Sequence, residues 1–313
     1  MRRLAAVLLL ALPLAVVPAG AEDLYNRDVC PVQPTREFPA GFALPVDRQA
    51  AECASSAQPW ADDHVGGWGG GDCPADHRPR TPVVFVHGNT TDGWFWRADP
   101  ESSDGTIRNV RQQLLDQGWC AAELWAITYS GDATPRGSYG SGYTTYNEIN
   151  AEEVYEFLRG VRDFTGAPRV DVVAHSLGVT VVRKAMFLHR DDAESPYSLV
   201  RRAVMIAGGN HGTTGCRFGT LLRPNEVCWE TDPASTWLAE LNAFGESPGP
   251  TEWMAICECS GLADAGFLLI DRFSPLLAGS IQVQLPYNAH NTLARGDVAL
   301  EQYLPFLAGG SEW

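Results

Sequence analysis

Ser176 has the sequence surroundings of a catalytic nucleophile. It follows the apolar run VDVVAH at 170–175 and precedes LGVTVV, which has the pattern of a helix. A tight turn from a buried strand into a helix lifts a serine hydroxyl above the sheet edge, where it can attack a carbonyl carbon. The usual pattern is Gly-x-Ser-x-Gly; here Ala174 replaces the first glycine and Gly178 supplies the second. The alternative is a serine that only caps its helix.

His87-Gly88-Asn89 ends a second apolar run, VVFV at 83–86. Nucleophilic attack on a carbonyl creates an oxyanion that needs N–H donors. In hydrolases with this strand-turn-helix nucleophile, the donors come from the residue after the nucleophile and from the loop after an early strand. We therefore expect the backbone N–H groups of Asn89 and Leu177 to form the oxyanion hole. The alternative for His87-Gly88 is an ordinary turn at a strand end.

A general base is expected late in the chain, because the order in such enzymes is serine, acid, histidine. His211 and His290 follow Ser176 beyond its own helix. His290 comes after the strand-like IQVQL and the short loop PYNA, and we predict that it is the base. His211 precedes every plausible acid, so we interpret it as a loop residue near the site.

The acid of the triad has three candidates in the sequence. Asp264 follows the strand-like WMAIC and is the predicted acid, because a strand's carboxyl end places its loop at the catalytic edge. Asp271 lies in a segment with a helical pattern and is the main alternative. Asp232 lies in the expected loop insertion at 208–250 and is the weakest candidate.

The resulting chemistry is acyl transfer through an acyl-enzyme, and it requires no metal or organic cofactor. Three adjacent aromatic residues, Trp94, Phe95 and Trp96, follow the predicted oxyanion loop. They could bind the acyl part of a substrate, or they could pack beneath the sheet edge.

Alternating apolar strands and amphipathic helices predict an α/β fold with a mostly parallel sheet between helices. The expected strands are 82–86, 122–129, 170–174, 203–207, 254–257 and 281–285. The expected helices are 106–117, 148–164, 176–189, 234–243, 266–277 and 298–307. Residues 208–250 depart from the alternation and are expected to form a loop insertion.

The N-terminus predicts export. Arg2 and Arg3 precede an apolar stretch at 4–17, and Ala19-x-Ala21 suits signal peptidase, with cleavage before Glu22. A membrane anchor is the alternative, but this stretch is too short to span a bilayer of about 30 Å. We expect a signal peptide at 1–21, an irregular arm at 22–80 and a catalytic domain at 81–313.

All eight cysteines lie after the predicted leader, and an even number in an exported chain favours disulfides. Cys30, Cys53 and Cys73 are expected to tie the arm to the domain. Zinc bound through Cys257-x-Cys259 is the alternative, but no second cysteine pair with ligand spacing accompanies it.

The charge of the chain argues against nucleic acid as a partner. There are 23 basic and 38 acidic residues, and without Arg2 and Arg3 the balance is 21 − 38 = −17. Binding to nucleic acid depends on cationic contacts with phosphate. The sequence makes no prediction about the oligomeric state.

The motifs AHSLG and HGN, with the order Ser176, Asp264, His290, resemble those of secreted bacterial lipases of the small Bacillus type. VVFVHGN, AITYS with a following Tyr-Asn segment, VDVVAHSLGV and AGGNHG are more similar to lipase-like extracellular poly(3-hydroxybutyrate) depolymerases. The resemblance covers about 82–310. It implies an α/β-hydrolase fold, a Cys216–Cys228 disulfide, Asn89 and Leu177 as oxyanion donors, and Asp264 as the acid.

Three functions remain open at this level. The first is a secreted lipase or esterase, and the second is a polyester depolymerase with the same triad. The third is a non-hydrolytic member of the fold, either a binding protein or an acyltransferase. A complete triad with an oxyanion loop argues against the third.

Overall fold

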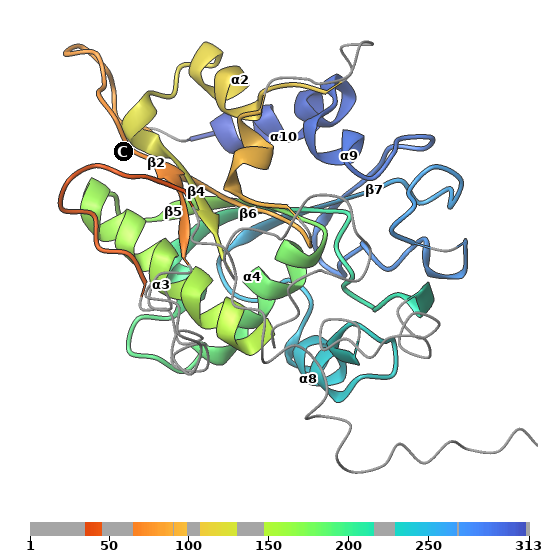
Figure 1. Ribbon diagram of the computed structural model, residues 1–313. Helices are drawn as coiled ribbons and strands as arrows, with labels where there is room; N and C mark the ends of the chain where they lie inside the picture. Colours follow the sequence, from red (N-terminus) through yellow and green to blue (C-terminus); the bar gives the residue numbers. More distant parts are fainter. Residues whose placement is uncertain are drawn as a thin grey trace, which may run out of the picture.

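The computed structural model describes residues 35–45, 65–89, 91–98, 107–129, 147–215, 229–267 and 269–310. The predicted signal peptide and Cys30, Cys53, Cys216 and Cys228 lie outside these residues, so the expected Cys216–Cys228 pairing does too. An eight-stranded sheet crosses the molecule with helices on both faces (Figure 1). The expected α/β-hydrolase-like architecture is confirmed.

The sheet has the strand order β1-β2-β4-β3-β5-β6-β7-β8. In the part of the sheet with the order β4-β3-β5-β6-β7-β8, every strand runs parallel to the next. β2 is antiparallel to β4. Parallel strands all end at one edge, which we call the carboxyl edge. The strands are β1 (Arg36–Glu37), β2 (Gly66–Gly69), β3 (Val83–Val86), β4 (Leu124–Thr128), β5 (Val170–His175), β6 (Val200–Ile206), β7 (Glu252–Cys257) and β8 (Ile281–Gln284).

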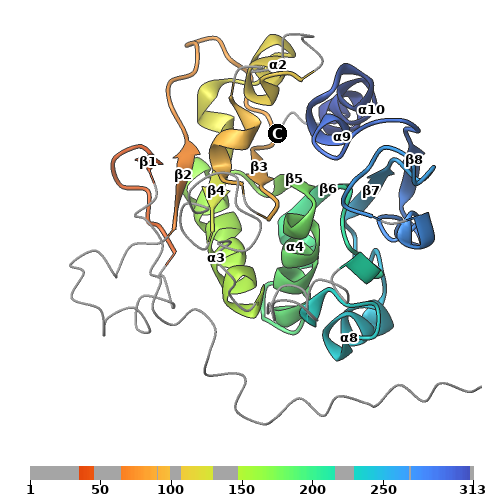
Figure 2. The same cartoon turned by 45° about the vertical axis from the view of Figure 1, so that its right-hand side comes forward.

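Two helical layers cover the sheet (Figure 2). The long helices α3 and α4 lie against one face, and α2, α9 and α10 lie against the other. The helical segments are η2 (Gly93–Trp96), α2 (Val110–Asp116), η3 (Ala121–Glu123), α3 (Asn147–Thr165), α4 (Leu177–Leu188), α5 (Pro196–Leu199), α8 (Thr236–Phe244), η4 (Leu269–Asp271), α9 (Thr292–Arg295) and α10 (Asp297–Ala308). No helix in the described part of the chain is long and apolar enough to cross a membrane.

The alternation of side chains along β3 shows why its sequence is apolar throughout. Val84 and Val86 pack into the core under α3 and α4, whereas Val83 and Phe85 pack into the core on the side of α2 and α10. Successive strand residues point to opposite faces, and both faces are covered. Because both faces are buried, every position of the strand is apolar, and this continuous apolar run is the pattern that predicted the strand.

Part of the segment expected to be an irregular arm belongs to the sheet. β2 pairs with β4, and a Cβ on Gly67, whose φ is +124°, would lie 2.0 Å from the carbonyl oxygen of Ala126. Trp68 is buried, and its Nε1 donates to the carbonyl of Gly93 at 2.7 Å. Three of the four residues of β2 are glycines, so the strand has almost no side-chain pattern that could have predicted it.

The prediction of a helix at 266–277 is wrong. In the described part of this range, the short 3₁₀ turn η4 is the only helical segment, and Leu269, Ile270 and Phe273 are exposed. A helix with this apolar pattern requires a core to cover its face, and this segment instead passes over the surface.

Two disulfides lie among the described residues. Cys73 pairs with Cys120, which joins the segment after β2 to the segment before β4 and agrees with the expected attachment of the arm. Cys257 pairs with Cys259, which overturns the zinc alternative because neither sulfur is a free thiolate. Among the residues that the structure describes, one group has metal-ligand spacing. It consists of Cys73, His77 and Cys120, but its two cysteines are bonded to each other.

Candidate active site

Ser176 lies in a strained turn between β5 and α4. Its φ is 56° and its ψ is −125°, a left-handed conformation that a non-glycine residue rarely adopts. A Cβ on Gly178 would lie 2.3 Å from the carbonyl oxygen of His87, so glycine is required for the first turn of α4 to pass the end of β3. The half-buried serine therefore stands at the carboxyl edge, at the N-terminus of a helix.

The end of β3 lies directly against Ser176. A Cβ on Gly88 would be 2.7 Å from the Ser176 Cβ and 3.3 Å from its Oγ. Asn89 follows Gly88 and is exposed, while Leu177 is the first residue of α4. The structure thus brings the two predicted oxyanion donors into neighbouring backbone segments. Helix N-termini stabilise negative charge, which suits a developing oxyanion.

His87 holds this backbone in place together with Tyr129. The His87 Nδ1 donates to the Gly88 carbonyl at 2.8 Å, and its Nε2 accepts from the Tyr129 backbone N–H at 3.3 Å. The Tyr129 hydroxyl donates to the His87 carbonyl at 2.9 Å, and the two rings stack at 4.1 Å. Burial lowers the pKa of His87 to about 4, so the ring is neutral near pH 7. The sequence did not indicate a role for Tyr129; its only signal is its position directly after β4.

His290 and Asp264 form a close pair. The His290 Nδ1 donates to Asp264 Oδ1 at 2.7 Å, and the Gly266 N–H donates to the same oxygen at 2.8 Å. Asp264 is 5% exposed, whereas the His290 side chain is 24% exposed. A Cβ on Gly266 would lie 2.8 Å from the His290 ring, so the turn after Asp264 must pass the ring closely. A buried carboxylate on Nδ1 leaves Nε2 as the nitrogen that can accept a proton.

His175 connects the nucleophile strand with the base loop. Its Nε2 donates to the His290 carbonyl at 3.0 Å, and the two rings lie 4.6 Å apart. Burial, and then the charge of His290, lower the pKa of His175 well below its usual value. Among the described residues, Ser176 Oγ has no hydrogen bond with the His290 ring. Catalytic hydrogen bonds of unliganded enzymes often close only when substrate binds.

The two alternative acids and His211 have other hydrogen-bond partners. The Asp271 carboxylate accepts from the Thr214 N–H at 2.7 Å and from its hydroxyl at 2.6 Å. His211 contacts Glu246 and the Ser274 carbonyl, both at 3.1 Å. Asp232 accepts from the Ala234 N–H within the insertion. The structure thus places Asp264, and not Asp271, in contact with the His290 ring, and the role of Asp264 as the acid stays a prediction.

The three aromatic residues near the oxyanion loop favour the packing alternative. Trp96 is fully buried in the core, and Phe95 stacks on the His175 ring at 5.2 Å. Trp94 is half-buried beneath the guanidinium of Arg97. Their expected role as a substrate-binding wall is therefore wrong for Trp96, because η2 turns its side chain toward the sheet.

Exposed apolar side chains lie instead on the loop between β7 and β8, which carries Asp264. They are Leu262, Leu269, Ile270 and Phe273, with exposures from 48% to 77%. A hollow of about 490 Å³ adjoins this loop and is lined by His211, Glu246 and Asp271 among others, but not by Ser176, Asp264 or His290.

Comparison with known proteins identifies the family. The model of the class 2 lipases matches residues 80–264. A lipase of Bacillus licheniformis in its mature form is similar over 75% of this chain and 96% of its own, with 14% identity and a TM-score of 0.55. The propeptide form of that lipase is similar over 78% of this chain and 52% of its own, with the same identity and TM-score. Lipase B of Aspergillus fumigatus has 13% identity over 72% of this chain and 53% of its own, with a TM-score of 0.49.

The fold and the site thus define an α/β-hydrolase. The family model covers more than half of the chain, so the chain belongs to the class 2 lipases and is an ester hydrolase. The solved structures support the fold alone, because their identity to this chain is low.

Proposed function

We propose that this protein is an exported hydrolase of lipid esters that acts through Ser176, His290 and Asp264. The observation that carries the proposal is the 2.7 Å contact between His290 Nδ1 and Asp264 Oδ1, at the same sheet edge as the strained turn of Ser176. Export is supported by the N-terminal leader pattern and by the disulfides.

The reaction follows from these positions. His290 Nε2 takes the hydroxyl proton as Ser176 Oγ attacks the ester carbonyl. Asp264 stabilises the resulting imidazolium, and the N–H groups of Asn89 and Leu177 hold the oxyanion. His290 then protonates the leaving alcohol. It next takes a proton from the water that attacks the acyl-enzyme. It returns this proton to Ser176 Oγ as the bond between Oγ and the acyl carbon breaks and the acid leaves.

Labelling with a serine-directed phosphonate tests this mechanism. We expect one phosphonate per chain, attached to Ser176, together with loss of tributyrin hydrolysis. Ser176→Ala should prevent both labelling and hydrolysis. A Ser176→Ala protein that hydrolyses tributyrin at the wild-type rate would rule the mechanism out.

Depolymerisation of an insoluble polyester is the second candidate. The exposed apolar residues at 262–273 favour it, because such side chains can contact a hydrophobic polymer surface as well as a lipid. Clearing of a polyhydroxybutyrate suspension, measured beside tributyrin hydrolysis, separates the two substrate classes. Clearing at a comparable rate favours the depolymerase, and tributyrin hydrolysis alone favours the lipase.

A further inference from the structure

Glu258 is a buried carboxylate between the two loops that carry the acid and the base. It follows β7 directly and is 2% exposed. No arginine, lysine or histidine of the described chain forms an ion pair with it. Burial of a carboxylate without a cation is costly unless hydrogen bonds satisfy it. Its hydrogen bonds therefore show what the side chain does.

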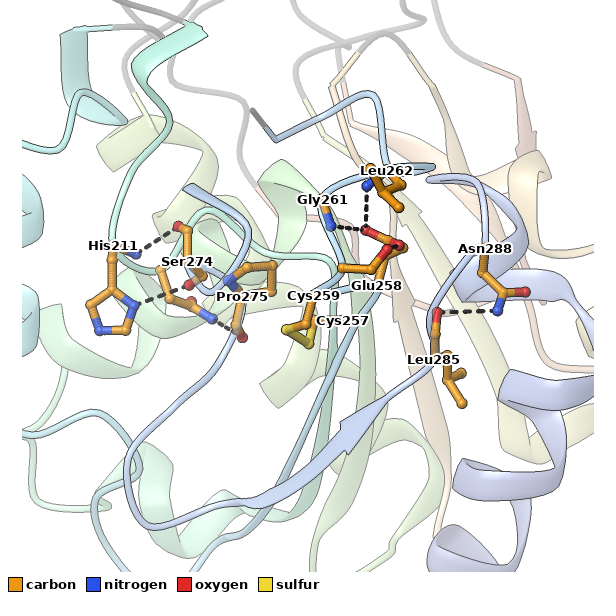
Figure 3. Close-up of a disulfide and its surroundings, with 12 residues drawn as sticks. His211, Cys257, Glu258, Cys259, Gly261, Leu262, Ser274, Pro275, Leu285 and Asn288 are labelled. Atoms are coloured by element: carbon orange, nitrogen blue, oxygen red, sulfur yellow. Dashed lines mark hydrogen bonds between the residues drawn. A yellow bond between two sulfur atoms is a disulfide. The ribbon is translucent and has the colours of Figure 1, made fainter. Parts of the chain in front are cut away.

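One carboxylate oxygen organises the acid loop. The Glu258 Oε2 accepts from the Gly261 N–H at 2.6 Å and from the Leu262 N–H at 3.3 Å (Figure 3). Gly261 and Leu262 lie three and two residues before Asp264. Gly261 has a φ of +74°, so the chain turns sharply at this point. The carboxylate thereby fixes the path of the backbone from β7 to Asp264.

The other oxygen reaches the base loop. The Glu258 Oε1 accepts from the Tyr287 N–H at 3.0 Å and from the Ser260 hydroxyl. Tyr287 lies three residues before His290 and has a φ of +65°. A single carboxylate thus joins the backbones that approach both members of the 2.7 Å pair.

The Cys257–Cys259 disulfide constrains the backbone from which the Glu258 side chain projects. It closes a ring across Glu258 (Figure 3). The Leu285 N–H donates to the Cys257 carbonyl at 2.8 Å. Cys259 has a φ of +52°, which turns the chain as it leaves β7. The ring therefore fixes the backbone of Glu258 relative to the strand end and to β8.

We propose that Glu258 is a positioning residue for the Asp264–His290 pair and that the Cys257–Cys259 disulfide holds it in place. The inference rests on the proposed function of that pair. A shift of about 1 Å in a catalytic group can lower a rate by about 100-fold. Loss of the carboxylate should therefore act on the chemical step and leave substrate binding nearly unchanged.

Three variants test the proposal. Glu258→Gln keeps the length but directs an amide N–H₂ at N–H donors, and Glu258→Asp keeps the charge but is too short to join both loops. We expect each to lower kcat on a soluble p-nitrophenyl ester by about 10- to 100-fold with little change in KM. Glu252→Gln is the matched control, because Glu252 is an exposed acid at the opposite end of β7, and it should retain wild-type kcat.

Two further measurements distinguish positioning from stability or charge. The acid limb of kcat/KM against pH should move to lower pH in Glu258→Gln, because a loosened pair stabilises the His290 imidazolium less. The downfield proton resonance of His290 Nδ1 should weaken in both Glu258 variants. If neither variant folds, Ser260→Ala removes one donor and should lower kcat by a smaller factor.

Several outcomes would overturn the inference. One is a Glu258→Gln enzyme with the wild-type kcat and the wild-type acid limb of kcat/KM against pH. Another is full activity of Glu258→Asp, because the charge alone would then be sufficient. A lower melting temperature with an unchanged kcat, or an unaffected Ser260→Ala enzyme, would make the role structural only. Failure of the phosphonate to label wild-type Ser176 rejects the proposed function instead, and the His290 resonance still decides whether Glu258 positions the ring.

Discussion

At the scale of single residues, the site depends on which nitrogen of each histidine bears a proton. His290 directs Nδ1 to a buried carboxylate, His175 directs Nε2 to a carbonyl, and His87 uses one nitrogen as donor and the other as acceptor. Each partner selects one tautomer. His290 is the one of these three whose ring is partly exposed, which leaves its Nε2 accessible as a base toward Ser176. The remaining nitrogen of His175, Nδ1, is buried without a hydrogen-bond partner among the described residues.

Asp264→Asn should lower kcat by about 10⁴-fold, because an amide cannot stabilise the imidazolium and favours the wrong tautomer of His290. Asp271→Asn is the control, since Asp271 contacts Thr214 and not the base. Steady-state hydrolysis of tributyrin by both variants is the measurement. Normal activity of Asp264→Asn together with lost activity of Asp271→Asn would show that Asp271, and not Asp264, is the acid.

His87 predicts a pH dependence of stability. Burial lowers its folded pKa to about 4 from an unfolded value near 6.5, so between these values the unfolded chain binds the additional proton. The contribution of a neutral His87 is present above pH 6.5 and is lost as the pH falls toward 4. The loss is up to about 3 kcal/mol in the free energy of unfolding. Urea unfolding at pH 7 and pH 4.5 measures it.

His87→Gln serves as the comparison for that measurement. Glutamine does not titrate, so the variant should be less stable at pH 7 but lose less stability on acidification than the wild type. Equal losses in both proteins would mean that His87 does not carry the effect.

At the scale of elements, the nucleophile depends on how closely α4 can approach the end of β3. The contact is made by backbone, since Gly178 faces the carbonyl of His87 and Gly88 faces Ser176. Ala174, on the strand side of the turn, is fully buried and is accommodated. The two small positions of the motif therefore have different tolerances, which the pattern alone does not distinguish.

Gly178→Ala should nearly abolish activity, because its Cβ would lie 2.3 Å from the His87 carbonyl oxygen and displace either the turn or the oxyanion loop. We expect a loss of about 100-fold or more in kcat and about 1–3 kcal/mol in stability. Ala174→Gly is the matched control and should remain active. Esterase assays and thermal unfolding test both, and a fully active Gly178→Ala enzyme would contradict the packing argument.

At the scale of the whole molecule, the candidate catalytic groups and the Cys73–Cys120 disulfide lie at opposite edges of the sheet. The triad candidates lie at the carboxyl edge, where β5, β7 and β8 end. The Cys73–Cys120 disulfide lies before β4 begins, at the other edge. A change at this disulfide should therefore affect unfolding without moving the catalytic groups.

Replacement of Cys73 and Cys120 together by alanine should lower the free energy of unfolding by about 2–5 kcal/mol, because the bridge closes a long loop of the unfolded chain. The sequence separation of the two cysteines is 47 residues. Activity at 25 °C should persist. The Cys257→Ala, Cys259→Ala protein provides the contrast, with a smaller loss of stability and a lower kcat. Chemical denaturation and ester hydrolysis of both proteins measure this, and unchanged unfolding in the first would refute it.

Much of the fold could be predicted from the sequence because the central strands are buried on both faces. β3, β5 and β7 appear as apolar runs, and their confirmed positions differ from the expected ones by two residues or fewer. β2 was missed because glycines leave no pattern, and the helix expected at 266–277 was wrong because apolar periodicity does not reveal whether a core covers it.

The sequence by itself determined the chemical groups of the candidate site and their order along the chain, since a strand-turn-helix motif and strand-end residues are local features. Their catalytic roles stay predictions. Only the tertiary structure decided that Asp264, and not Asp271, contacts His290, that Trp96 packs inward, and that Glu258 joins two loops. Each of these depends on contacts between residues far apart in the chain, and such contacts are set by the packing of the sheet and its loops.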